Sequence, residues 1–320
     1  MNPASMKRLD FRLPDFTRFG WVSDPARDVW QPRIQRIVAC RQQLEWLSVV
    51  HGLRDCCLTL VSTTKLVDLA AQLIRHELVA LPIAKQKVSS QPYATVSARP
   101  QPGDKFDYRV VVGSVKNTAV FKIAWDSGDK NTQRELLGYP ICCGLFFEKI
   151  WDHEKFMDTT WPMAMNTLGF ATEDCLCDIE QVTMETNVLL RWLGVRAVSH
   201  LPCSFSCHSS ASLGRSFMEL GRNCGFQSEV QWTDEILSWP VEWSALHGIA
   251  EIKSPIVKIS TCTDATAEKY IVRYHGRVYP ELGAQGLTFP YRPPDHTRVT
   301  GSNSFRRGLE HPIQLIEKTV

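Results

Sequence analysis

The 320-residue sequence has no long apolar run: no stretch approaches the ~20 consecutive apolar residues that a helix needs to cross a bilayer. Its first eight residues, Met1 to Arg8, also lack the apolar segment of a secretory signal peptide. An excess of charge is missing too, because 36 Lys and Arg residues stand against 34 Asp and Glu residues, a formal net charge of +2. These absences predict a cytoplasmic protein without a membrane partner, and they argue against nucleic acid as a partner.

Several motifs of known chemistry are missing as well. The chain has no Gly-rich phosphate loop and no Gly-x-Ser-x-Gly elbow. The pair Cys203 and Cys207 lacks a third cysteine at position 210, which is Ser, and this argues against the radical S-adenosylmethionine class. What the chain does have is 11 cysteines, which a reducing compartment would keep as thiols. We interpret them as metal ligands, reactive thiols or small core residues.

Two stretches repeat one construction, a proline followed within three residues by cysteine and then by a run of helical character. They are Leu137–Cys143 and His200–His208. Proline is favoured at the first helical position, so we predict that both sets of cysteines lie in the first turns of helices, where free N–H groups and the helix dipole favour thiolate. Cys203 and Cys207 would then share a helical face, with His200 just ahead of the helix and His208 one step off that face.

The two stretches together predict one metal site. Adjacent helical residues point about 100° apart, so we expect one of Cys142 and Cys143 to be a ligand. With Cys203 and Cys207 this makes three thiolates, and either His200 is the fourth ligand or the position is open. Cys₃His suits zinc, whereas three cysteines and a vacant corner suit an iron–sulfur cluster or catalytic zinc. The alternative is that the Cys142 and Cys143 thiols are small apolar groups packed in a helix.

The candidate metal ligands are therefore Cys142, Cys143, His200, Cys203 and Cys207, with an iron–sulfur cluster or zinc as the cofactor. Cys203 and His200 are also the candidate catalytic residues. For the pair Cys175 and Cys177 we favour a loop with one buried thiol. We expect the remaining cysteines to be small side chains packed in the core: Cys40, Cys56, Cys57, Cys224 and Cys262. A further set of residues could serve acid/base chemistry or ligation, but we favour solvated charges or turn caps for them: Asp152, His153, Glu154, Glu242, His247 and Glu251.

The spacing of apolar residues predicts an α+β fold, in which helices carrying the two Pro-Cys N-termini pack with short, mostly antiparallel strands. Helices are expected over residues 31–51, after Thr63 and Thr64, within 126–137 up to a break at Gly138, from Pro140, and from Pro202. Strands are expected at 108–112 and 119–125, as a hairpin, and at 249–252, 256–261 and 269–274. Along the chain we expect an arm at 1–30 without long regular elements, an α/β region at 31–127, a cysteine-rich core at 128–284 and a surface tail at 285–320.

A group of prokaryotic proteins, known as a domain of unknown function, carries motifs that this chain resembles. The resemblance rests on Leu136-Leu137-Gly138-Tyr139-Pro140-x-Cys142-Cys143 and, about sixty residues later, on His200-x-Pro202-Cys203-x₃-Cys207. It covers roughly residues 130–260. It supports treating the two cysteine stretches as one site, and it implies no reaction.

Three functions follow as hypotheses. The first is an intracellular enzyme that uses the metal or iron–sulfur site on a small molecule. The second is a metal-free thiol protein in which Cys203 is a nucleophile or sulfur carrier and Cys207 or Cys143 resolves it. The third is a binding module with a purely structural zinc.

Overall fold

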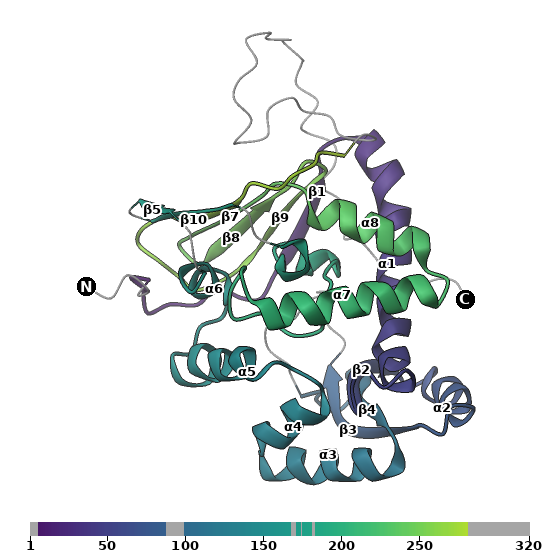
Figure 1. Cartoon of the computed structure of the whole chain (residues 1–320). Helices are drawn as coiled ribbons and strands as arrows, with labels where there is room; N and C mark the ends of the chain where they lie inside the picture. Colours follow the sequence, from purple (N-terminus) through teal and green to yellow (C-terminus); the bar gives the residue numbers. More distant parts are fainter. Residues whose placement is uncertain (1–5, 88–98, 168–170, 174, 181–182, 281–320) are drawn as a thin grey trace.

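The computed structural model describes residues 6–87, 99–167, 171–173, 175–180 and 183–280 (Figure 1). These residues form an α+β fold with two sheets, as predicted from the sequence. The tail predicted for residues 285–320 lies outside them. Among the described helices, none combines the length and the apolar character that crossing a bilayer requires.

The larger sheet has seven strands in the order β1-β9-β8-β7-β10-β6-β5, and every pairing is antiparallel except that of β10 with β6. Its strands are β1 (Thr17–Trp21), β5 (Ala171–Glu173), β6 (Leu176–Ile179), β7 (Val241–Leu246), β8 (Ile249–Lys253), β9 (Val257–Cys262) and β10 (Tyr270–Tyr274). The smaller sheet is antiparallel, in the order β2-β4-β3, with β2 (Cys56–Ser62), β3 (Val79–Lys87) and β4 (Phe106–Gly113). The expected short, mostly antiparallel strands are confirmed.

The α-helices are α1 (Asp24–Val50), α2 (Leu66–Ile74), α3 (Val115–Ser127), α4 (Lys130–Leu136), α5 (Ile141–Phe147), α6 (Thr160–Met165), α7 (His208–Asn223) and α8 (Gln227–Leu237). The π-helix η1 (Glu148–His153) continues α5, and η2 (Met184–Thr186) and η3 (Arg191–Leu193) are short 3₁₀ turns. Helices α1, α7 and α8 lie together over one face of the large sheet (Figure 1). The main core fills the space between them, and within it the rings of Trp30 and Trp239 meet edge to face at 4.7 Å.

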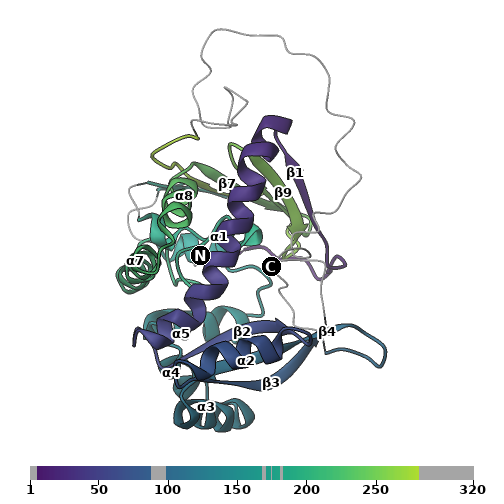
Figure 2. The ribbon, with the colours of Figure 1, turned by 90° about the vertical axis from the view of Figure 1, so that its right-hand side faces the viewer.

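Helix α1 joins the two sheets. Its 27 residues correspond to a rod of about 40 Å, and Figure 2 shows it running from the large sheet down to the small one. Ile34 packs in the main core, whereas Trp46, three turns further on, packs against the small sheet.

Two local predictions are wrong. Helix α1 begins at Asp24, inside the segment expected to be an irregular arm, because the Ser23 side chain accepts a hydrogen bond from the Ala26 N–H and Pro25 occupies the first turn. The second strand of the expected hairpin is part of helix α3. Ser114 caps its start, and the buried Thr118, Phe121 and Ala124 recur every three residues, a helical spacing.

The break between α4 and α5 is confirmed. The Asp129 carboxylate accepts hydrogen bonds from two N–H groups at the start of α4, and Gly138 ends the segment with a φ of 65°. A Cβ at position 138 would stand 3.0 Å from the Arg54 Cβ, so glycine serves both the backbone conformation and the close approach to the segment that leads into β2. The chain then restarts as α5 immediately after Pro140.

Candidate metal centre

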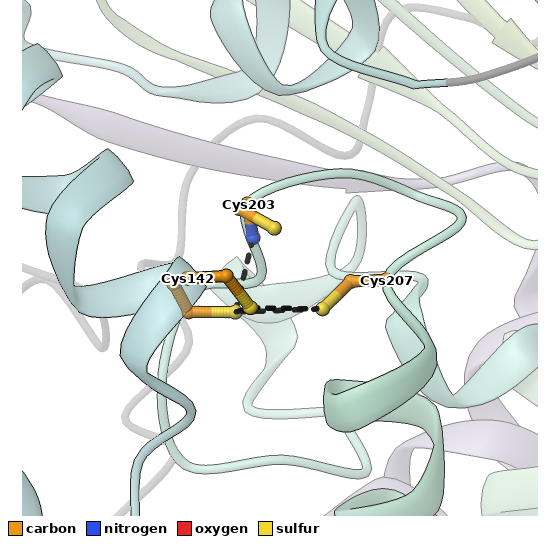
Figure 3. Close-up of side chains that lie close together, drawn as sticks. Cys142, Cys203 and Cys207 are labelled. Atoms are coloured by element: carbon orange, nitrogen blue, oxygen red, sulfur yellow. Dashed lines mark hydrogen bonds between the residues drawn. The ribbon is translucent and has the colours of Figure 1, made fainter.

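Four cysteine sulfurs gather at one point. The Sγ atoms of Cys142, Cys143, Cys203 and Cys207 all lie within 4.8 Å of one another. Figure 3 shows their origin: Cys142 comes from the first turn of α5, and Cys203 and Cys207 come from the segment that enters α7. The expectation that the two Pro-Cys stretches form a single cluster therefore agrees with the geometry.

The spacing of the sulfurs is close to that of ligands around one ion. The Cys142 Sγ lies 3.9 Å from the Cys143 Sγ and 3.8 Å from the Cys207 Sγ, and the Cys143 and Cys207 sulfurs are 3.6 Å apart. A tetrahedron with Zn–S bonds of about 2.3 Å has S···S edges of about 3.8 Å. The thiols are thus arranged with ligand-like separations.

Cys142 and Cys143 both belong to the cluster. Because adjacent helical residues point about 100° apart, the sequence predicts only one of them as a ligand. The reason is their place at the very start of α5. The Pro140 carbonyl accepts hydrogen bonds from the N–H groups of Cys143 and Gly144, which closes the first turn. The sulfurs of Cys203 and Cys207 lie beside this first turn, within 4.8 Å of both the Cys142 and the Cys143 sulfur.

The second stretch differs from the prediction, because no helix starts at Pro202. Helix α7 begins at His208, and Cys207 is its N-cap, with its sulfur accepting a hydrogen bond from the Ser210 N–H at 3.5 Å. The loop before Cys207 is instead stabilised by hydrogen bonds to residues from another part of the chain. The Asn166 side chain donates to the Cys203 carbonyl at 2.9 Å, and the Phe205 N–H donates to the Thr167 hydroxyl at 3.0 Å. These partners satisfy the backbone groups that a helix would have paired.

Hydrogen bonds among the buried sulfurs favour the thiolate form at Cys207. The Cys203 N–H donates to the Cys143 Sγ at 3.3 Å, and the Ser210 hydroxyl lies 3.1 Å from the same sulfur. The pKa of the Cys207 thiol is held well below its ordinary value, because the thiols of Cys143 and Cys203 and the groups of Ser210 direct hydrogen bonds to it. The pKa of Cys143 is raised by its bonds to Cys203 and Cys207 and by burial, so negative charge settles first on Cys207.

His200 lies behind the cluster. Its Nε2 is 2.7 Å from the Ser210 hydroxyl, its ring packs on Tyr139 at 5.2 Å between centroids, and its buried Nδ1 has no hydrogen-bond partner among the described residues. Burial, helped by the positive charges of Arg196, Arg41 and Arg54, lowers the pKa of His200 to about 4. His200 is therefore neutral at pH 7. The four-sulfur group does not include it, so its assignment as a ligand and catalytic residue stays a prediction.

Ser210 is the residue that the sequence analysis missed. Its hydroxyl lies between the His200 ring and the Cys143 sulfur, and its N–H caps onto Cys207. The spacing of the residues could have indicated this role. Ser210 is the third residue after the N-cap Cys207, and at that position of a helix a free N–H donates back to the capping side chain. His208, by contrast, is exposed and does not belong to the cluster.

The other cysteines lie apart from the cluster. Cys56 and Cys57 are buried in β2 as predicted, and burial raises the pKa of each to about 12. Cys177 is buried in strand β6, not in a loop, and the Cys175 thiol lies 3.5 Å from a carboxylate oxygen of Glu268. Packing is confirmed for Cys40 and Cys262, which are buried, whereas Cys224 is half-buried with its sulfur 3.8 Å from the His51 Nε2.

One residue interpreted as a solvated charge is buried. Glu242, in the central strand β7, is 4% exposed and forms ion pairs with Arg273 at 3.1 Å and Lys253 at 3.5 Å. The stems of these two cations lie across the neighbouring strands and shield the carboxylate from water. Glu251 pairs with Lys258 at 2.9 Å at the edge of the same group.

Comparisons with protein-family models, with curated proteins and with solved structures gave no match to this chain. The resemblance to a domain of unknown function therefore stays a prediction, and any function has to be argued from the cluster itself.

Proposed function

We propose that this protein binds one metal ion through Cys142, Cys143, Cys203 and Cys207, and that the ion is zinc. The observation that supports the proposal is the set of S···S separations, which are 3.6–3.9 Å among Cys142, Cys143 and Cys207 and at most 4.8 Å to Cys203, near the edges of a tetrahedron around a single ion. Cysteines that bind different irons of a cluster cannot approach one another so closely, since each sulfur is held at its own iron. A single ion is thus favoured over an iron–sulfur cluster.

Four thiolates close the coordination shell, which is typical of structural zinc rather than of a catalytic zinc with an open position. The ion would hold the start of α5 against the start of α7, two segments that are about sixty residues apart in the chain. Of the three hypotheses, the structural zinc is therefore the one that the geometry favours. Thiolate ligands have to stay reduced to bind the ion, and on that ground we place the protein in the cytoplasm.

The test is the metal content of the full chain, purified without oxygen and measured by mass spectrometry of the elements. We expect close to one zinc per chain, no metal in Cys203→Ser, and no metal in the double variant Cys142→Ser, Cys143→Ser. Cys56→Ser is the matched control, because it alters a buried thiol outside the cluster and should keep the metal.

Folded wild-type protein that carries no metal would refute the proposal. Metal retained by the Cys142 and Cys143 double variant would show that the two stretches do not share one ion. A brown colour with broad visible absorbance and stoichiometric iron would replace zinc by iron, and sulfide in the same preparation would replace the single ion by a cluster.

A further inference from the structure

We propose that Cys142 is a reactive, metal-bound thiolate that accepts an alkyl group from uncharged carbon electrophiles. This inference rests on the proposed zinc site and adds a chemical activity to it.

The first observation is the unequal exposure of the four ligands. Cys143 is 2% exposed, Cys207 is 6% exposed and Cys203 is 9% exposed, whereas Cys142 is an exposed residue. An electrophile arriving from water therefore meets the Cys142 sulfur first. The ion and the other three sulfurs lie behind it.

The second observation is the unequal hydrogen bonding of the sulfurs. Cys143 accepts the Cys203 N–H and lies beside the Ser210 hydroxyl, and Cys207 accepts the Ser210 N–H. Within the described part of the chain, the Cys142 Sγ has only the sulfurs of Cys143 and Cys207 as recorded partners. A hydrogen bond to sulfur draws electron density away from it and lowers its nucleophilicity. Cys142 keeps that density.

Charge adds to this reactivity. Four thiolates around one divalent ion leave roughly two surplus negative charges on the sulfurs. The thiolate is the nucleophilic form of cysteine, and it is also the form in which cysteine binds a metal ion. Of the four thiolates, Cys142 is the one that solvent reaches.

The third observation is the character of the surface around Cys142. Ile141 is 77% exposed and Leu145 is 55% exposed, on the same helix and directly beside Cys142. Leu145 is three residues further along, so its side chain lies on the same face as the sulfur. An apolar rim and a negatively charged centre together favour uncharged, apolar alkylating agents and disfavour anionic ones.

The step balances without an oxidant. A lone pair of the Cys142 Sγ attacks the electrophilic carbon and forms a C–S bond. The bond from that carbon to its leaving group breaks, and the leaving group departs with the electron pair. The product is a thioether, which carries no charge, so one of the surplus negative charges is removed while Cys143, Cys203 and Cys207 retain the ion.

The experiment alkylates the full, metal-bearing chain with limiting iodoacetamide and locates the label by peptide mass spectrometry, after the metal content has been measured. We expect Cys142 to be labelled at least ~10-fold faster than Cys224, a half-buried thiol outside the site, with the zinc retained. Anionic iodoacetate should label Cys142 more slowly than iodoacetamide does, and by a larger factor than at Cys224, because the surplus negative charge of the site repels it. Cys224→Ser is the control variant and should keep the fast phase.

Protein without metal overturns the proposed zinc site, whatever the labelling pattern. Metal-bearing protein that is labelled first at another cysteine overturns the inference alone. So does metal-bearing protein in which iodoacetate and iodoacetamide differ in rate by the same factor at Cys142 and at Cys224, because Cys142 would then be an ordinary exposed thiol.

Discussion

Replacing Ser210 with Ala should weaken metal binding without removing a ligand. The Ser210 hydroxyl lies 3.1 Å from the Cys143 sulfur and 2.7 Å from the His200 Nε2, so it connects a neutral imidazole to a metal-binding thiol. With zinc bound, the hydroxyl donates to the Cys143 thiolate and the His200 Nε2–H donates to the hydroxyl. The variant loses both hydrogen bonds but keeps the N–H of residue 210 that caps onto Cys207.

The expected magnitudes follow from these two contacts. Losing a hydrogen bond that orients a metal ligand typically lowers affinity by about 10- to 100-fold, which is ~1.4–2.7 kcal/mol. The loss also leaves both nitrogens of the His200 ring without a partner, since Nδ1 has none among the described residues. A buried, unsatisfied polar group costs about 1–3 kcal/mol of folding stability. The variant should therefore lose affinity and stability together.

Zinc affinity is measured by competition with a chelator, and stability by urea unfolding at fixed zinc concentration. Ser209→Ala is the matched control, because Ser209 is exposed on the same turn of α7. Adding His200→Phe to Ser210→Ala removes the unpaired nitrogens and keeps a ring against Tyr139, so it should recover stability but not affinity. Equal zinc affinities for the Ser210 and Ser209 variants would refute the reasoning.

Three further predictions concern the remainder of the fold. Glu45→Gln should lower the free energy of unfolding by about 3–5 kcal/mol in chemical denaturation, because it leaves the buried guanidinium of Arg54 without its carboxylate. Burial alone would raise the pKa of Glu45, but Arg54 and Arg41 outweigh it and lower the pKa to about 2. The unfolded chain therefore binds the proton more readily, and this stabilisation, present above pH ~4.5, should be lost as the pH falls to about 2, with a shallower loss in Glu45→Gln. Cys57→Ser should cost ~1–3 kcal/mol in the same assay, with zinc content unchanged, since Cys57 is fully buried outside the cluster.

The sequence predicted the convergence of the two cysteine stretches because both signals are local. Gly138 and Pro140 mark a helix end and a helix start by their backbone restrictions alone, and they place Cys142 and Cys143 in a first turn. The same rule applied to Pro202 gave the wrong helix start. There the amides are satisfied by distant partners, including the Thr167 hydroxyl, which no local pattern reveals.

Other errors have the same physical origin. The run 119–125 is rich in residues that also suit strands. It forms a helix because Ser114 caps the N-terminus and because Phe121 packs against the small sheet. Ser210 looked like one of several small residues on α7, because its role depends on where His200 and Cys143 arrive from other parts of the chain. Local chemistry predicted which cysteines would gather in one place, and tertiary packing decided which other residues contact them.

The cluster lies at the junction between the two sheets, and helix α1 helps to hold the same junction. Leu137, just before α5, packs in a cluster with Phe121 against the small sheet, so Cys142 and Cys143 follow that sheet. The opposite half of the site is tied to α1, because Ser199 donates a hydrogen bond to Glu45 at 2.7 Å directly before His200. Glu45 also pairs with Arg54, which leads into β2. The proposed metal ion would therefore restrain the same relative position of the two sheets as the Glu45 ion pair does, so removal of either should loosen the other.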